Sequence, residues 1–214
     1  RAGAKSIEEL AQPEEKLAGL RINATIFAPS RSSGYIGITL KRTHGEEERV
    51  IGDLPVGKIM SVNFSPDSKN LAFIVENLEG LTLWNYDLES AKTKQVSGQK
   101  INASLGGTKY RWKNDSSGFY TRLTVALASE KPRALKATIE PVIQTTSGKK
   151  AAVRTYSNLL KTPYDEELFE FLTRSQLAEI TLSGNVKNLG KAAMYKGFNV
   201  SPDGKYLLVS QIKK

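Results

Sequence analysis

The side chains that could act as nucleophiles, bases or metal ligands are few in this sequence. It contains no cysteine, and His44 is its single histidine. A thiol nucleophile, a Cys-ligated zinc or iron–sulfur site and a paired-histidine metal motif are therefore excluded. The sequence Gly-x-Ser-x-Gly, which presents a serine nucleophile on a tight strand-to-helix turn, occurs nowhere in the 214 residues. We predict no catalytic residue, no metal site and no cofactor within this chain.

The remaining polar candidates have structural explanations. His44 lies in the polar stretch 42–46, which predicts a hairpin tip, because a catalytic base needs both an orienting acid and a nucleophile. Gly106 and Gly107 are followed neither by Lys-Ser/Thr nor by a predicted helix, so they do not form a phosphate loop. The two tryptophans lie in predicted strands and are assigned to the core.

A cluster of carboxylates marks the start of a helix. Thr162 can cap the first turn and Pro163 suits the first helical position, which predicts a helix over 163–174 packed on the rim of a sheet. The acidic residues favour the positive end of the helix dipole and a solvated face rather than a metal site. They are Asp165, Glu166, Glu167 and Glu170.

The charge is positive but dispersed. Lys and Arg number 31 against 22 Asp and Glu, for a formal net charge of +9. The densest basic stretch, 131–161, contains Tyr156 as its single aromatic residue, which is poorly suited to stacking on bases. We expect neither a nucleic-acid partner nor a membrane partner.

An internal repeat organises the chain. A strand, a Ser-Pro-Asp-like turn and a second apolar strand begin at Phe64 and again at Val200, and a degenerate copy begins at Trp112. The first two copies in sequence are 48 residues apart and the last two 88, which is near twice a 44-residue period. Repeats of this length are typical of the four-stranded blades of β-propellers.

The repeats predict a mainly β fold, a partial β-propeller of four-stranded antiparallel blades. Residues 58–97 form one whole blade, and a second combines 108–126 with 176–189. The insertion 127–175 separates the halves of the second blade and contains the predicted helix. An outer hairpin precedes the two blades and an inner one follows them. About two whole blades and two half-blades are below the four to eight of a closed propeller, so we expect the chain to be part of a longer one.

The segment before the blades does not contain the repeat. We divide the chain into a helical or extended lead-in, 1–33, and the partial propeller, 34–214. Within the lead-in, Ser6 and Glu9 could form a capping box for a helix over 6–20, which Pro13 would end or kink.

Several blocks of the sequence resemble glutamyl endopeptidase-like and dipeptidyl aminopeptidase-like members of the prolyl oligopeptidase family. Two blocks are specific: residues 6–23 (SIEELAQPEEKLAGLRIN), and residues 153–161 (VRTYSNLLK) with 164–169 (YDEELF) and 175–177 (SQL). Tyr195 with 201–209 (SPDGKYLLV) resembles the following blade, although many propellers share such a turn.

The resemblance implies a serine peptidase in two parts. An N-terminal propeller covers a C-terminal α/β-hydrolase domain that holds the catalytic Ser, Asp and His, and related proteins are often exported, which favours a periplasmic or secreted location. No position here matches a catalytic residue. The propeller of this family restricts the access of substrate, so the resemblance implies that this chain gates peptide access. If the whole protein cleaves after acidic residues, arginines near the blade strands or the insertion could contact the substrate. The candidates are Arg111, Arg122 and Arg154.

Two other interpretations remain open at this point. The Ser-Pro-Asp hairpins fit a TolB-like or WD-repeat-like scaffold for protein binding with no enzyme attached, or a free-standing small β protein that closes its half-blades on each other. In every case strand edges around 35–41 and 206–212 would be open, and they could pair within the chain or in an edge-strand dimer.

Overall fold

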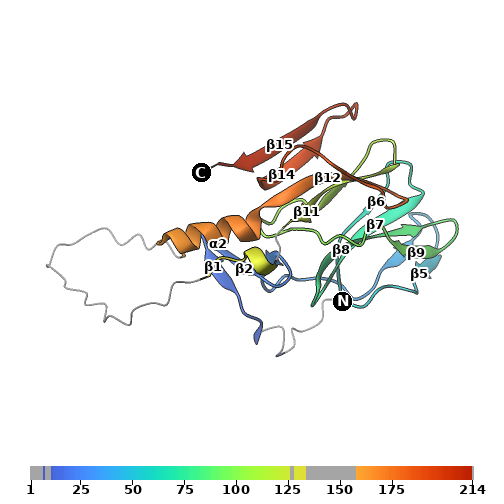
Figure 1. The fold of residues 1–214 in the computed structure, drawn as a ribbon. Coiled ribbons are helices and arrows are strands. Elements are labelled where there is room, and N and C mark those ends of the chain that lie inside the picture. The colour runs from blue at the N-terminus through green and yellow to red at the C-terminus, as the bar shows by residue number, and fades with distance from the viewer. Residues whose placement is uncertain (1–6, 8–10, 126–127, 134–157, 214) are drawn as a thin grey trace, which may run out of the picture.

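The computed structural model describes residue 7 and residues 11–125, 128–133 and 158–213. Within these residues the chain is mainly β, and its strands form separate antiparallel sheets of two, three or four strands. Successive sheets stand side by side (Figure 1), as blades do in a propeller, and they do not close into a ring. The predicted partial β-propeller is thereby confirmed.

The first whole blade contains four strands in sequence order. They are β6 (Lys58–Phe64), β7 (Asn70–Asn77), β8 (Gly80–Asp87) and β9 (Lys92–Gln95). All neighbouring pairs are antiparallel. The structure therefore confirms the blade predicted over 58–97.

The second blade is assembled from two distant parts of the chain. Its strands are β10 (Tyr110–Trp112), β11 (Gly118–Thr124), β12 (Ser175–Thr181) and β13 (Val186–Asn188). The β11–β12 ladder pairs every residue of both strands. The outer half of this blade thus arrives after the insertion, as the repeat predicted.

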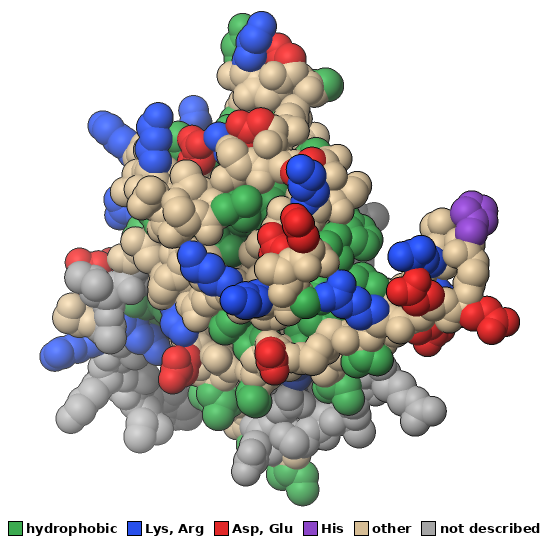
Figure 2. All heavy atoms as spheres, turned by 90° about the vertical axis from the view of Figure 1, so that its right-hand side faces the viewer, with side chains coloured by type: hydrophobic (Ala, Val, Ile, Leu, Met, Phe, Trp, Pro, Cys, Tyr) green, Lys and Arg blue, Asp and Glu red, His purple; other side chains and the backbone are tan. Residues whose placement is uncertain are grey.

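A hairpin flanks the two blades on each side. The first joins β4 (Thr39–Lys41) to β5 (Glu48–Val50), and the second joins β14 (Met194–Val200) to β15 (Leu207–Ile212). His44 is exposed in the turn of the first hairpin, at the end of an arm that projects from the molecule in Figure 2. The predicted hairpin tip is confirmed.

Strand β7 is buried on both faces. Leu71, Phe73 and Val75 pack toward the β4–β5 hairpin in a cluster with Ile51. The intervening Ala72 and Ile74 join a second cluster with residues of the other blade, including Phe119 and Ile180. The nearly continuous apolar sequence of this strand follows from that position between two packed layers.

The three copies of the repeat form turns of the same shape. In the first, the Ser65 hydroxyl donates to the Asp67 carboxylate (2.5 Å) and accepts from the backbone N–H of Asn70 (2.9 Å). The third copy repeats both bonds through Ser201, at 2.6 and 2.9 Å. The same hydroxyl bond lowers the pKa of Asp67 and of Asp203 below the usual range. Both aspartates are turn residues, as the repeat indicated.

Helix α2 (Pro163–Thr173) confirms the helix predicted over 163–174. Thr162 and Asp165 form a reciprocal capping box, with Pro163 in the first turn. Its packing differs from the prediction: the apolar face, with Leu168 and Leu172, contacts the lead-in and Met194 rather than the rim of the second blade. The following strand β12 begins after the single residue Arg174, so the helix meets the sheet at its end.

The lead-in forms a small sheet that the sequence did not predict. Its strands are β1 (Glu15–Leu17), β2 (Leu20–Asn23) and β3 (Ala28–Pro29). The helix predicted over 6–20 is therefore wrong from Glu15 onward, and residues 1–6 and 8–10 lie outside the described part. Ala18 and Gly19 both have positive φ, at 49° and 76°, which makes a tight hairpin turn where the helix was expected. The division into 1–33 and 34–214 stays a prediction.

The repeat makes a testable prediction about backbone strain. Ser68, Ser116 and Gly204 occupy the same turn position with φ of 59°, 60° and 73°. Because side chains with a Cβ are disfavoured there, Ser68→Gly should stabilise the fold by about 0.5 kcal/mol, whereas Gly204→Ala should destabilise it by about 1 kcal/mol. Urea denaturation midpoints measure both changes. A lower midpoint for Ser68→Gly, or an unchanged one for Gly204→Ala, would contradict the assignment.

Candidate functional site

The first strands of three successive sheets, β6, β10 and β14, lie against one another. The Tyr110 hydroxyl of β10 lies 2.7 Å from the carbonyls of Ser61 and Ala72 and can donate its one proton to either of them. Trp112 donates its indole N–H to the carbonyl of Asn63 at 3.3 Å. Burial raises the pKa of the Tyr110 phenol far above its usual value, so it acts as a fixed donor. These bonds hold the first two blades in one relative position.

The neighbouring turns are also joined. The Ser116 hydroxyl in the second turn accepts from the backbone N–H of Asp67 in the first, at 3.0 Å. Asn114 of the second turn donates its amide to the carbonyls of Ser201 and Pro202 in the third, at 2.9 and 2.7 Å. The turn-bearing ends of the three strands are therefore positioned by direct hydrogen bonds.

A hollow of about 320 Å³ opens where these three strands meet. The same two repeat positions of each strand line it, one polar and one apolar. The polar positions are Asn63, Arg111 and Asn199, and the apolar ones are Phe64, Trp112 and Val200. None of the described residues that line the hollow is Asp or Glu, so Arg111 gives this lining a positive charge. We take this inner-strand hollow as the candidate functional site.

Arg111 is exposed in β10 and is available to a ligand. Within the part of the chain that the structure describes, no hydrogen bond or ion pair joins its side chain to another residue. By contrast, Lys113, two residues later, is paired with Glu179 at 2.8 Å and Asp115 at 3.6 Å. Of the two predicted wall arginines that the structure describes, Arg111 and Arg122, it is Arg111 that lines this hollow.

Arg122 has a structural role instead of the predicted contact with substrate. Its side chain is only 1% exposed. Its guanidinium donates to the carbonyls of Tyr195 and Lys196 in β14, and to those of Gly106 and Thr108 before β10. Burial lowers its pKa to about 10, which leaves the group charged at neutral pH. Arg122 therefore fastens the second blade to the strand that follows it.

The third predicted arginine, Arg154, lies outside the described residues. Residues 153–157 of the specific block 153–161 lie there too. The role of Arg154 stays a prediction.

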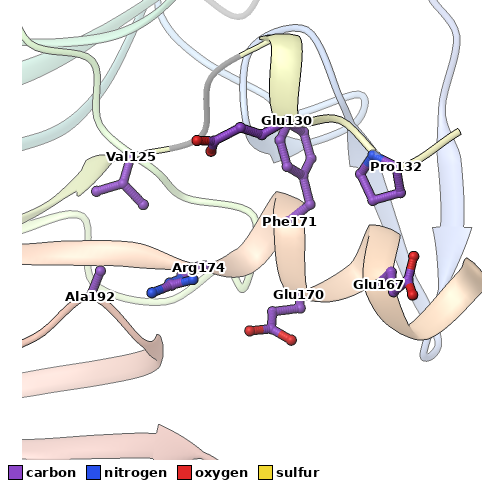
Figure 3. A pocket seen from close by; sticks show the side chains of 8 residues that line it. All are labelled: Val125, Glu130, Pro132, Glu167, Glu170, Phe171, Arg174 and Ala192. Atoms are coloured by element: carbon purple, nitrogen blue, oxygen red, sulfur yellow. The ribbon is translucent and has the colours of Figure 1, made fainter. Parts of the chain in front are cut away.

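A second hollow, of about 500 Å³, lies beside α2 (Figure 3). Side chains from the helix, from the short turn η1 (Ala128–Glu130) and from the chain after β11 converge there. Glu167 and Glu170 contribute from the helix, and Arg174 contributes from the position just after it.

Asp165, at the start of the helix, caps it and accepts from the backbone N–H groups of Lys161 and Thr162, which lowers its pKa. The predicted dipole role of Asp165 is confirmed.

The described residues contain neither a metal-binding cluster nor a membrane-spanning helix. No group of three or more His, Cys, Asp or Glu side chains in this part of the chain could hold a metal ion. Among the same residues, no helix is long and apolar enough to cross a membrane.

The two blades, together with the inner wall formed by strands β6, β10 and β14, define the class of the protein as a partial β-propeller. Two curated plant proteins, each named probable glutamyl endopeptidase, chloroplastic, match 97% of the chain. The protein from Oryza sativa subsp. japonica is 32% identical and the one from Arabidopsis thaliana 30% identical. The chain spans about a quarter of the length of these relatives, 24% and 23% respectively. The resemblance to glutamyl endopeptidase-like proteins is confirmed, and no protein-family model matches the sequence.

Three solved structures resemble parts of the chain. TolB from Acinetobacter baumannii has a TM-score of 0.45 and 15% identity over 81% of this chain and 31% of its own. Acylaminoacyl peptidase from Pyrococcus horikoshii has a TM-score of 0.34 and 12% identity, over 74% of this chain and 28% of its own. The tricorn protease has a TM-score of 0.31 and 11% identity, over 78% and 21%.

The sequence reasoning missed the neighbours of Arg111. Asn63 and Asn199 had no signal of their own, but both stand one position before the residues that open the first and third repeat copies. Aligning the repeat one position further toward the N-terminus would have grouped them with Arg111.

The role of Arg122 predicts a large loss of stability on substitution. Arg122→Met leaves four backbone carbonyls without their donor, so we expect the free energy of unfolding to fall by at least about 3 kcal/mol. Arg122→Lys should recover less than half of this loss, because a single ammonium cannot reach both the carbonyls of β14 and those before β10, as the planar guanidinium does. Denaturant titration measures each change.

A matched substitution controls for the loss of an arginine. Arg21 forms an exposed ion pair with Glu14, at 3.1 Å, so Arg21→Met should cost less than about 1 kcal/mol. Equal effects of Arg122→Met and Arg21→Met would contradict the structural role of Arg122.

Proposed function

We propose that this chain is the N-terminal propeller part of a serine peptidase of the prolyl oligopeptidase family. The observation that carries the proposal is the match of nearly the whole chain to two proteins named as glutamyl endopeptidases, of which it covers about a quarter. The remaining length of such a protein leaves room for the other blades and for a C-terminal α/β-hydrolase domain. That domain is the proposed partner of this chain and the source of the catalytic Ser, Asp and His.

The proposed role of the propeller is to gate peptide substrates. Hydrogen bonds between β6, β10 and β14 give the inner wall a fixed shape, which supports selection by size. An extended peptide could pass along such a wall, whereas a folded protein could not. Arg111 is the wall residue best placed to contact a passing substrate, because it is exposed and lines the hollow. A periplasmic or secreted location stays a prediction from the resemblance.

The test uses the full-length product of the source gene. We expect a fluorophosphonate probe, which reacts with activated serines, to label the protein. We also expect it to cleave peptides of about ten residues that contain glutamate, and to leave a stably folded protein of the same composition intact.

Each outcome has a distinct meaning. Absence of labelling together with absence of peptide cleavage would overturn the peptidase proposal and favour the alternative, a propeller scaffold for protein binding. Labelling with equally fast cleavage of peptide and folded protein would support a peptidase and contradict gating.

A further inference from the structure

We propose that the β4–β5 hairpin is the outer half of a mixed blade that closes the propeller ring. Its inner half is the inner hairpin of the last blade, a later segment of the same polypeptide, and the second strand of that hairpin pairs with the free edge of β4. This inference rests on the part of the proposed function that makes the chain a portion of a longer propeller protein, and it adds how that propeller closes.

The hydrogen bonds of the β4–β5 hairpin match those of the outer strands in both whole blades. In each blade, the residue just after the fourth strand donates its backbone N–H to a carbonyl of the third. These bonds join Val96 to Leu83 at 2.9 Å and Leu189 to Leu177 at 2.8 Å. Ile51, just after β5, donates in the same way to the carbonyl of Ile38, just before β4, at 3.0 Å. The hairpin therefore corresponds to the third and fourth strands of a blade.

The two hairpins of this chain are different halves of a blade. β14–β15 carries the Ser-Pro-Asp turn that joins a first strand to a second, whereas β4–β5 has the turn around His44. They lie at opposite ends of the row of sheets (Figure 1), because Ile51 packs on the first blade while Tyr195 and Phe198 pack on the second. Both whole blades stand between them, so another segment has to supply the inner half of the β4–β5 blade.

The register shows which backbone groups of β4 face the free edge. Ile51 donates to Ile38 and Arg42 donates to Glu47, so the bonds within the hairpin fall on alternate residues of β4. The intervening Thr39 and Lys41 therefore direct their backbone N–H and C=O groups away from β5. This is the edge at which a second strand pairs with a third in both whole blades.

The hairpin is poorly buried without such a strand. All three residues of β5 are exposed, and Tyr35 and Ile36, just before β4, are 57% and 71% exposed. A two-stranded hairpin is at best marginally stable in water, and three or more strands are usually needed. Two further strands would complete a four-stranded sheet like those of the whole blades.

The same polypeptide is a better source of these strands than a second copy of the chain. The chain spans 24% and 23% of the length of its two curated relatives, which leaves room for further repeats of about 44 residues. A segment that belongs to the same polypeptide is present at a high effective concentration, so pairing within one molecule is favoured over pairing between two.

The experiment compares two proline variants of the full-length product of the source gene. Thr39 and Val50 are register partners, and their backbone N–H groups point to opposite edges of the hairpin. The N–H of Thr39 faces the edge where we place the added strand, and that of Val50 faces the outer rim. Proline removes the N–H in either variant and is tolerated only at an unpaired edge. Thr39→Pro should therefore lower the melting temperature by at least about 5 °C, and the control Val50→Pro by less than about 2 °C.

Hydrogen–deuterium exchange of the wild-type protein measures the same edge directly. We expect the backbone N–H groups of Thr39 and Lys41 to exchange at least about 100-fold more slowly than that of Val50, because pairing protects them from water. Mass spectrometry with electron-transfer fragmentation resolves the individual positions. This measurement decides the pairing even if Thr39→Pro fails to fold.

The outcomes separate this inference from the proposed function. Equal shifts of melting temperature in Thr39→Pro and Val50→Pro, or rapid exchange at Thr39 and Lys41, would overturn the mixed blade. Protection at these two positions that disappears on dilution would assign the added strand to a second copy and contradict closure within one molecule. Failure of the fluorophosphonate to label the protein would overturn the peptidase proposal alone, because neither proline variant nor exchange depends on an active serine.

Discussion

The structure depends on one constraint: each of the two four-stranded blades is apolar on both faces and needs a neighbour on each side. In β7, alternate residues enter two different clusters, so Phe73 packs toward the β4–β5 hairpin while Ile74 packs toward the second blade. A single blade would leave one of these faces in water. The hydrophobic effect therefore stabilises a row of blades rather than any one of them, and it fixes the distance between their first strands.

The inner-strand hollow forms because the sheets stack side by side with their first strands next to one another. Sheets that repeat the same register bring the same repeat positions side by side, so three residues far apart in sequence line one surface. Hydrogen bonds then fix the relative positions of the packed sheets. Tyr110 and Asn114 form them at the turn-bearing ends, and Arg122 forms them near the opposite ends. Arg111 and Arg122 differ in role because their side chains point in different directions. Arg111 is exposed at the first strand of its sheet, whereas Arg122 extends from the second strand to backbone carbonyls of β14 and of the segment before β10.

Local chemistry made much of the fold predictable. The Ser-Pro-Asp turns, the hairpin around His44 and the cap at Thr162 each depend on bonds among residues close in sequence, so the sequence alone indicates them. The β1–β2 hairpin was missed because Ser6 and Glu9 form a capping-box pattern that indicates a helix, while the interactions that set the hairpin are tertiary. Leu17 and Ile22 pack with α2, and the Glu14 carboxylate accepts from Ser30 at 2.7 Å.

The candidate site was only partly predictable for the same reason. Arg111 and Arg122 look alike in sequence, since both lie in strands of one blade. Only the partners of Arg122, some 73 residues away, show that it is internal. The contribution of Asn63 and Asn199 depends on how adjacent blades align, and no single repeat contains that information.

The insertion leaves and re-enters the second blade at directly paired positions. Thr124, the last residue of β11, is the register partner of Ser175, the first residue of β12. A tight reverse turn could join these two ends, and the ladder between them would be unchanged. The register of the β11–β12 ladder therefore does not depend on the length of the inserted segment, so this junction is a position where the blade can accommodate insertions of different lengths.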